Sequence, residues 1–308
     1  MNDLVHLPPY RVSFPAVPLS EGVDWGVASY GIPELWKRTH GDGVTVAVID
    51  SGVAKHPALE VADYRNFTSD GEAHDTIGHG THVAGIIGAR SGSAKGIAPG
   101  CTLLSLKVLG HSGMGTQEAV AQAVYHATEA KADICCMSLG AARPDDRVHA
   151  AIRAAHAANV IVVCAAGNDG GAVNYPAAFP ETVGVGAVDK SGAACEFSSR
   201  GKEIVVAAPG QDITSTWLAG GYATISGTSM AAPFVAGVLA LWVSEQNKTK
   251  TPITHQSVIA ALQDTCRDAG ATGRDPIYGW GLLDPHRLLN YSLGASGITI
   301  FIPGGKVL

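Results

Sequence analysis

The chain has 308 residues, of which 46% are hydrophobic and 16% are charged, so its composition excludes an intrinsically disordered protein. The formal net charge is −6 and the sequence contains no basic run, which argues against a nucleic-acid partner. The longest strongly apolar run, residues 234–243, is about half as long as a membrane-spanning helix, so no membrane partner is expected.

The first 24 residues form a proline-rich leader, with prolines at positions 8, 9, 15 and 18. Proline fixes φ and has no backbone N–H, so we predict an extended conformation for residues 1–24. The leader lacks the basic start and apolar core of a secretory signal, which favours a cytoplasmic protein. The six cysteines contain no C-x-x-C pair and are expected to be buried, reduced thiols.

Residues 25–290 alternate between two kinds of pattern. Continuous β-branched and apolar runs predict strands buried on both faces of a parallel sheet, at 44–49, 102–108, 133–139, 160–165, 183–188 and 204–207. Amphipathic or apolar helical patterns occupy 79–90, 116–131, 146–159, 230–246 and 254–266. This alternation predicts a single α/β domain, with a mostly parallel central sheet and helices on both faces. A tail, residues 291–308, contains a β-prone segment at 297–302.

Three glycine-flanked turns carry residues that can do chemistry. Asp50 ends the first predicted strand, where an aspartate could equally stabilise a turn or bind Mg²⁺. His79 and His82 open a helix, but their spacing of three differs from the helical zinc motif, and a core role is an alternative. Ser229 begins an apolar helix, where a serine is ordinarily an N-cap.

The three residues together suggest nucleophilic acyl transfer. A serine hydroxyl becomes a good nucleophile when an imidazole takes its proton, and a carboxylate must orient that imidazole. Small neighbours let a peptide backbone approach the hydroxyl. A helix start also places N–H groups and a positive dipole end where oxyanion charge develops.

The order Asp, His, Ser and the strings DSG (50–52), HGTHVAG (79–85) and GTSMAAP (227–233) resemble the subtilisin family of serine proteases. Four further strings agree: LKVLG (106–110), SLG (138–140), AAGN (165–168) and VAAPG (206–210). The resemblance covers about residues 25–290. The nucleophile motif and residue order of α/β-hydrolases are not present.

This resemblance implies a subtilisin-like fold and a serine endopeptidase that acts through an acyl-enzyme. Asp50 would be the orienting carboxylate, His79 the general base, Ser229 the nucleophile and Asn168 the side-chain oxyanion donor. His82 would then be structural. An extended polypeptide substrate would pair with two segments, one made of Gly113, Met114 and Gly115 and the other of Ser138, Leu139 and Gly140, with Asn174 near the pocket floor.

Three departures from the family pattern lead to further expectations. Only about fifty residues precede Asp50, and the segment Leu7, Pro8, Pro9 and Tyr10 resembles the short leader of the intracellular members, which implies an inhibitory segment across the active site. No cofactor is expected for catalysis. A tight calcium site is not expected, since Ala58 replaces an acidic ligand and loop 90–95 carries two cations. Structural calcium could bind weakly to the backbone carbonyls of Ala177, Phe179 and Thr182.

Two other functions are compatible with the sequence. A catalytically silent relative could bind extended peptides without cleaving them. A dedicated maturation protease or transpeptidase could act on one partner peptide. Association into a homodimer is also left open.

Overall fold

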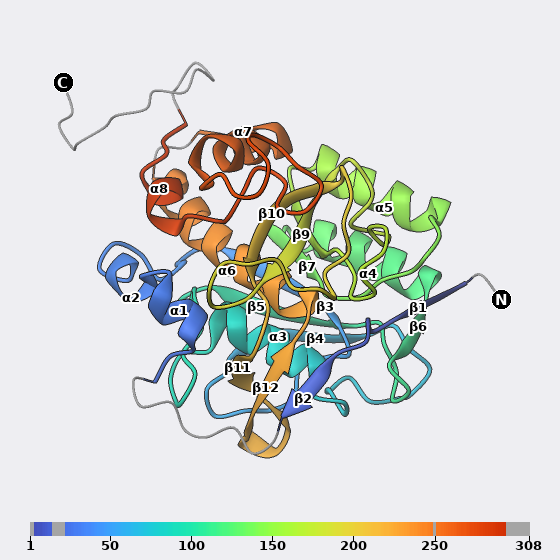
Figure 1. Ribbon diagram of the computed structural model, residues 1–308. Coiled ribbons are helices and arrows are strands. Elements are labelled where there is room, and N and C mark those ends of the chain that lie inside the picture. The colour runs from blue at the N-terminus through green and yellow to red at the C-terminus, as the bar shows by residue number, and fades with distance from the viewer. Residues whose placement is uncertain (1–2, 14–21, 249–250, 294–308) are drawn as a thin grey trace.

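The computed structural model describes residues 3–13, 22–248 and 251–293 (Figure 1). The β-prone segment at 297–302 therefore lies outside the described residues. The boundaries that separate the leader, the domain and the tail stay a prediction.

The core of the fold is a seven-stranded sheet in which every neighbouring pair is parallel. In sheet order its strands are β10 (Ile204–Pro209), β9 (Thr182–Val188), β8 (Ile161–Ala165), β7 (Ile134–Met137), β3 (Thr45–Asp50), β5 (Thr102–Lys107) and β4 (Val61–Asn66). The mostly parallel α/β fold predicted from the sequence is confirmed. Strand β4, an edge strand whose residues are only partly buried, was not predicted.

Helices cover both faces of this sheet (Figure 1). Alternate residues of β3 enter different hydrophobic clusters: Val46 and Val48 lie in one, and Ala47 and Ile49 lie in the other. The first cluster contains α3 (His79–Gly88) and α6 (Thr228–Asn247), and the second contains α4 (Gln117–Glu129) and α5 (Asp146–Ala157). Because successive side chains of a strand point to opposite faces, the same strand packs against both layers of helices.

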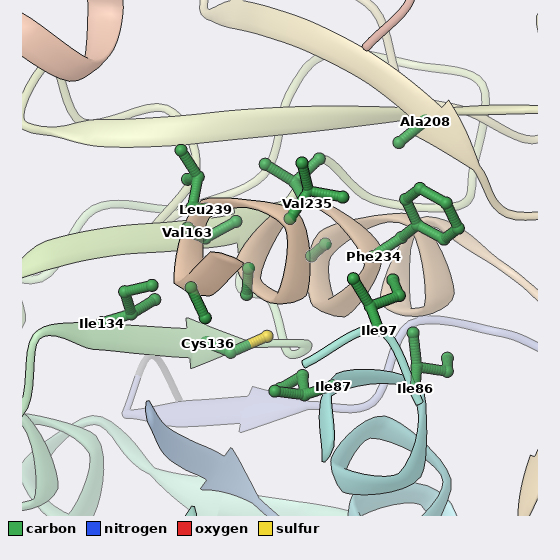
Figure 2. Packing of buried hydrophobic residues seen from close by; sticks show 14 of the residues in the cluster. Ile86, Ile87, Ile97, Ile134, Cys136, Val163, Ala208, Phe234, Val235 and Leu239 are labelled. Atoms are coloured by element: carbon green, nitrogen blue, oxygen red, sulfur yellow. The ribbon is translucent and has the colours of Figure 1, made fainter. Parts of the chain in front are cut away.

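Helix α6 runs through the larger cluster. Figure 2 shows Phe234, Val235 and Leu239 of α6 among side chains of the sheet and of α3. The helix is long and apolar enough to cross a membrane by composition, but 94% of its most apolar window is buried within the protein. It is therefore a core helix, and it begins at the edge of the sheet where Asp50 ends β3.

The first cluster also contains residues of four further helices, α1 (Trp25–Ser29), α2 (Ile32–Leu35), α7 (His255–Thr265) and α8 (Pro285–Leu289). The 3₁₀ turn η1 (Leu218–Gly220) has no buried residue. All six cysteines are buried and free.

The leader contributes strands to two small antiparallel sheets. Strand β1 (Leu4–His6) pairs with β6 (Met114–Thr116). Strand β2 (Arg11–Ser13) pairs with β12 (Tyr222–Ser226), which in turn pairs with β11 (Ile213–Thr216). The leader is thus extended at residues 4–6 and 11–13, and it crosses the edge of the main sheet between β6 and β12 (Figure 1).

Candidate active site

A buried carboxylate–imidazole pair lies where β3 ends and α3 begins. Asp50 is the last residue of β3 and His79 is the first residue of α3. Asp50 Oδ1 lies 2.8 Å from His79 Nδ1, and both side chains are fully buried. Gly80 allows this approach, because a Cβ at that position would lie 2.1 Å from the carbonyl oxygen of Gly52. The carboxylate therefore holds the imidazole through Nδ1 and leaves Nε2 to react.

Ser229 is the second residue of α6, and it is fully buried. Its hydroxyl donates a hydrogen bond to the Ser138 carbonyl oxygen at 3.3 Å, and the Ser138 hydroxyl donates back to the Ser229 carbonyl oxygen at 2.9 Å. His79 Nε2 makes no hydrogen bond to any described residue. The structure thus joins His79 to Asp50 but not to Ser229, whose hydroxyl faces Ser138.

Asn168 has an amide orientation that its neighbours determine. Its Oδ1 accepts hydrogen bonds from the backbone N–H of Thr228 at 2.8 Å and from the Thr228 hydroxyl at 2.7 Å. Its Nδ2 donates to the carbonyl oxygen of leader residue Pro9 at 2.8 Å. Because both donors act on Oδ1, the amide presents its NH₂ group to a carbonyl next to the start of α6. This is the geometry that an oxyanion donor requires.

The two segments predicted to bind substrate lie on either side of the leader. His6 exchanges two backbone hydrogen bonds of 3.0 Å with Gly140, and the backbone N–H of Leu7 donates to the Gly113 carbonyl oxygen at 3.1 Å. Met114 and Gly115 pair with β1 in β6, whereas Leu139 is buried. The side-chain amide of Asn174 lies against Gly140 and Gly167. These segments can therefore bind an extended peptide through main-chain bonds.

Asp75 is a residue of this region that was not predicted from the sequence. Its Oδ1 accepts hydrogen bonds from the Ser51 hydroxyl and from the backbone N–H groups of Ile77 and Gly78. Its Oδ2 accepts from the backbone N–H and the hydroxyl of Thr81. Gly78 supplies no side-chain cap for α3, so this buried carboxylate satisfies the N–H groups that precede His79. An aspartate four residues before the helix was the available signal.

His82 lies one turn after His79 and points into the protein. Its Nε2–H donates to the carbonyl oxygens of Ile213 and Ala223, each at 3.1 Å. Burial, and secondly the neighbouring His79, lowers the pKa of His82 to about 3. The ring is therefore neutral at ordinary pH, and its contacts tie α3 to β11 and β12.

The lowered pKa predicts a stability change with pH. Between pH ~6.5 and about 3 the unfolded chain binds a proton at His82 that the folded chain does not, so stability falls as the pH falls through this window. The slope from this one residue is at most about 1.4 kcal/mol per pH unit. Urea unfolding at pH 6.5, 5.5 and 4.5 should show a flatter pH profile for His82→Gln than for the parent chain. Parallel profiles would contradict the prediction.

Two of the carbonyl groups predicted to bind calcium weakly, those of Ala177 and Phe179, lie around the Thr182 hydroxyl. The Thr182 hydroxyl lies 3.1 Å from the Ala177 carbonyl oxygen and 2.9 Å from that of Phe179. Nowhere in residues 3–13, 22–248 and 251–293 do three or more His, Cys, Asp or Glu side chains gather as metal ligands. A site made of neutral carbonyls lacks the carboxylates that strong calcium sites use, so these residues could hold a calcium ion only weakly.

The loop of residues 90–95, where no tight calcium site is expected, is held by an ion pair and a cation–π contact. The Arg90 guanidinium pairs with Glu60, and the Lys95 ammonium lies 4.0 Å from the centre of the Trp36 ring. Both cations are thus held at this loop. The expectation that no tight calcium site exists here stays a prediction.

Comparison with known proteins adds an independent finding. Residues 41–281 match the sequence model of the Subtilase family, Peptidase_S8. The chain is 42% identical over 257 residues to an "Intracellular serine protease" of Paenibacillus polymyxa, covering 78% of each chain. It is 38% identical over 281 residues to the "Major intracellular serine protease" of Bacillus subtilis, covering 85% of this chain and 88% of that one. It is also 38% identical over 277 residues to a "Thermostable alkaline protease" of Halalkalibacterium halodurans, covering 88% and 74% respectively.

Proposed function

The chain belongs to the subtilase family of serine proteases, and from this premise we propose that it is an endopeptidase that cleaves extended polypeptides through an acyl-enzyme on Ser229. The observation that carries the proposal is the buried 2.8 Å contact between Asp50 and His79 at the end of β3, while Ser229 bonds Ser138 just after the end of the neighbouring parallel strand β7. Enzymes of this family need no cofactor for catalysis, and each step of the proposed mechanism uses only side chains and backbone groups of this chain.

In the proposed mechanism, a peptide lies between residues 113–115 and 138–140. The Ser229 hydroxyl turns toward His79, which takes its proton through Nε2 while Oγ bonds to the peptide carbonyl carbon. Asp50 stabilises the imidazolium that forms. Asn168 Nδ2 and the backbone N–H of Ser229 donate to the oxyanion. The imidazolium then gives its proton to the leaving nitrogen, and water hydrolyses the acyl-enzyme by the reverse sequence of proton transfers.

Product analysis on an unstructured protein tests this function. Incubation with casein should yield internal peptides, and the Ser229→Ala variant should yield none. If the chain without residues 1–20 binds peptides and cuts none of them, a catalytically silent binding protein is the better description. Cleavage of one partner peptide but not of casein would instead indicate a dedicated maturation protease.

We also propose that the leader holds the enzyme inactive. The Pro9 carbonyl accepts the Asn168 hydrogen bond that a substrate carbonyl would use. The Tyr10 ring lies 5.0 Å from the His79 ring, centre to centre, and its burial raises the pKa of the phenol. Under this cover His79 and Ser229 are fully buried, and the Ser229 hydroxyl faces Ser138. These contacts support a leader that competes with substrate for the same main-chain partners.

Deletion of residues 1–20 is therefore expected to raise activity. A tethered segment has an effective concentration in the millimolar range, so a leader with micromolar affinity would lower turnover of a small chromogenic peptide by roughly 10²-fold or more. Adding residues 1–13 back as a free peptide should inhibit the shortened enzyme, and a scrambled peptide of the same composition should not. Equal turnover by the intact and the shortened chains would rule out a restraining role.

The remaining features of the proposal have narrower support. The names of two relatives favour a cytoplasmic location for this chain. Polypeptides are the expected partners. Three further expectations stay predictions: that the chain has no nucleic-acid or membrane partner, that it can form a homodimer, and that it binds structural calcium weakly.

A further inference from the structure

We propose that a cavity on the leaving-group side of the scissile bond makes the enzyme prefer lysine or arginine two residues after that bond. The inference rests on the proposed peptidase function, because it concerns the substrate of the same site. The leaving-group side is the segment that departs as the amine product. Three features of the described residues support this proposal: a cavity, the register of the leader, and the charges that line the cavity.

The cavity has a volume of about 740 Å³ and opens beside the oxyanion donor. Leader residues Pro9 and Tyr10 line it on one side together with Asn168. Glu196, Phe197 and Asp212 are among the residues that line it elsewhere. The cavity therefore begins where the bond to be cleaved would lie and extends along the leaving segment.

The leader supplies the register of a peptide that crosses this site. The Pro9 carbonyl is held by Asn168, so Pro9 occupies the position of the residue whose carbonyl would be attacked. Tyr10 is then the first residue on the leaving-group side, and Arg11 is the second. In the β2–β12 pairing, Arg11 lies opposite Ser226. A substrate that follows the same path would place its second leaving residue at Ser226.

Ser226 forms hydrogen bonds with Asp212, which is one of the two carboxylate residues that line the cavity. Its hydroxyl donates to Asp212 Oδ1 at 3.1 Å and accepts the backbone N–H of Asp212 at 2.8 Å. Asp212 has a left-handed backbone, with φ of 54°, directly before the start of β11. The second leaving residue of a substrate would therefore lie next to a carboxylate that accepts a hydrogen bond from the Ser226 hydroxyl.

The charges around the cavity have one sign. Glu196 and Asp212 line it, no lysine or arginine does so in the described part of the chain, and neither carboxylate has an ion-pair partner there. Phe197 offers an apolar surface to the methylene stem of a long basic side chain. Two carboxylates without a cation attract a basic side chain and repel an acidic one.

The two segments that would bind the acyl side of a substrate carry no charged side chain, because residues 113–115 and 138–140 are glycine, methionine, serine and leucine. These two segments therefore give no selection by charge. The chain's own residue at the second leaving position, Arg11, is basic, which agrees with the proposed preference.

Internal competition between matched peptides tests the inference with the full-length chain. Three fluorogenic peptides would differ only at the second leaving position, with lysine, glutamine or glutamate. Two peptides in one reaction give a ratio of kcat/KM that does not depend on how much enzyme the leader occupies. At low salt we expect the lysine peptide to be cleaved on the order of tenfold faster than the glutamate peptide, and the ratio to shrink in high salt.

The double variant Glu196→Gln with Asp212→Asn should bring this ratio close to one. Asparagine tolerates the left-handed backbone of position 212, so the turn should be kept. Glu129→Gln, at the exposed end of α4, is a matched control that changes charge outside the cavity and should leave the ratio unchanged. Equal cleavage of the lysine and glutamate peptides by the parent chain, or an unchanged ratio in the double variant, would overturn this inference alone. Cleavage of none of the peptides, even by the chain without residues 1–20, would overturn the proposed function as well.

Discussion

Replacing Ser229 with alanine is expected to remove nearly all peptide hydrolysis, and His79→Ala should do the same. Each loss should reach roughly 10⁶-fold in kcat, which is the magnitude known for subtilisin itself. The double variant should lose about as much as either single variant, because the imidazole serves only to activate the hydroxyl. Single-turnover and steady-state rates on one peptide would give all three values.

Two controls separate this loss from unfolding. Near-ultraviolet circular dichroism should be the same for the variants and the parent chain. Ser191→Ala removes a hydroxyl from an exposed turn, where it bonds Asp189, and should retain activity. Losses that multiply in the double variant would show that Ser229 and His79 act independently, and the proposed triad would then be wrong.

Asn168→Ala is expected to lower kcat by roughly 10²–10³-fold with little change in KM, again the magnitude known for subtilisin. The amide stabilises charge that appears on the carbonyl oxygen only as the transition state forms, so substrate binding should hardly change. Steady-state kinetics with one peptide would separate kcat from KM.

A second variant, Asn168→Asp, tests whether the loss of kcat in Asn168→Ala comes from a disturbed structure instead of a lost oxyanion donor. Alanine at position 168 also leaves the Thr228 N–H and hydroxyl without their acceptor, which alone could disturb the start of α6. Asn168→Asp keeps an oxygen for both Thr228 donors but replaces the NH₂ group with a second oxygen. It should lose kcat at least as severely while unfolding at a temperature close to that of the parent. An Asn168→Asp variant that retained kcat would exclude the amide as the oxyanion donor.

The sequence predicted the buried parts of the fold better than the exposed ones. Strands such as β3 and β8 are buried along their whole length, and their β-branched runs are unambiguous. Strand β4 is half-exposed and contains Asp63 and Arg65, so it has no apolar run. Strand β11 contains threonine and serine that are buried by tertiary contacts, such as the hydrogen bond from the Ser215 hydroxyl to the His82 carbonyl oxygen. Such contacts leave no periodicity in the sequence.

The candidate site follows the same division. The motifs predicted that Asp50, His79 and Ser229 would gather, since parallel strands and the helices after them meet at one edge of the sheet. The structure joins Asp50 to His79, and the pairing of His79 with Ser229 stays a prediction. The sequence could not predict that the Ser229 hydroxyl faces Ser138, because a χ1 rotation is decided by its neighbours in space. The role of Asp75 depends on hydrogen bonds that form only when its loop folds onto α3. The register of the leader likewise depends on Asn168 and β12.

The most direct measurement of the central claim is covalent labelling with a fluorophosphonate, which bonds to a serine hydroxyl only when a base activates it. The protein would be labelled, digested and mapped by mass spectrometry, for the intact chain and for the chain without residues 1–20. The proposed mechanism predicts one labelled residue, Ser229, faster labelling after the leader is removed, and no labelling in His79→Ala. A label on a different serine, or an unlabelled Ser229 in the shortened chain, would contradict it.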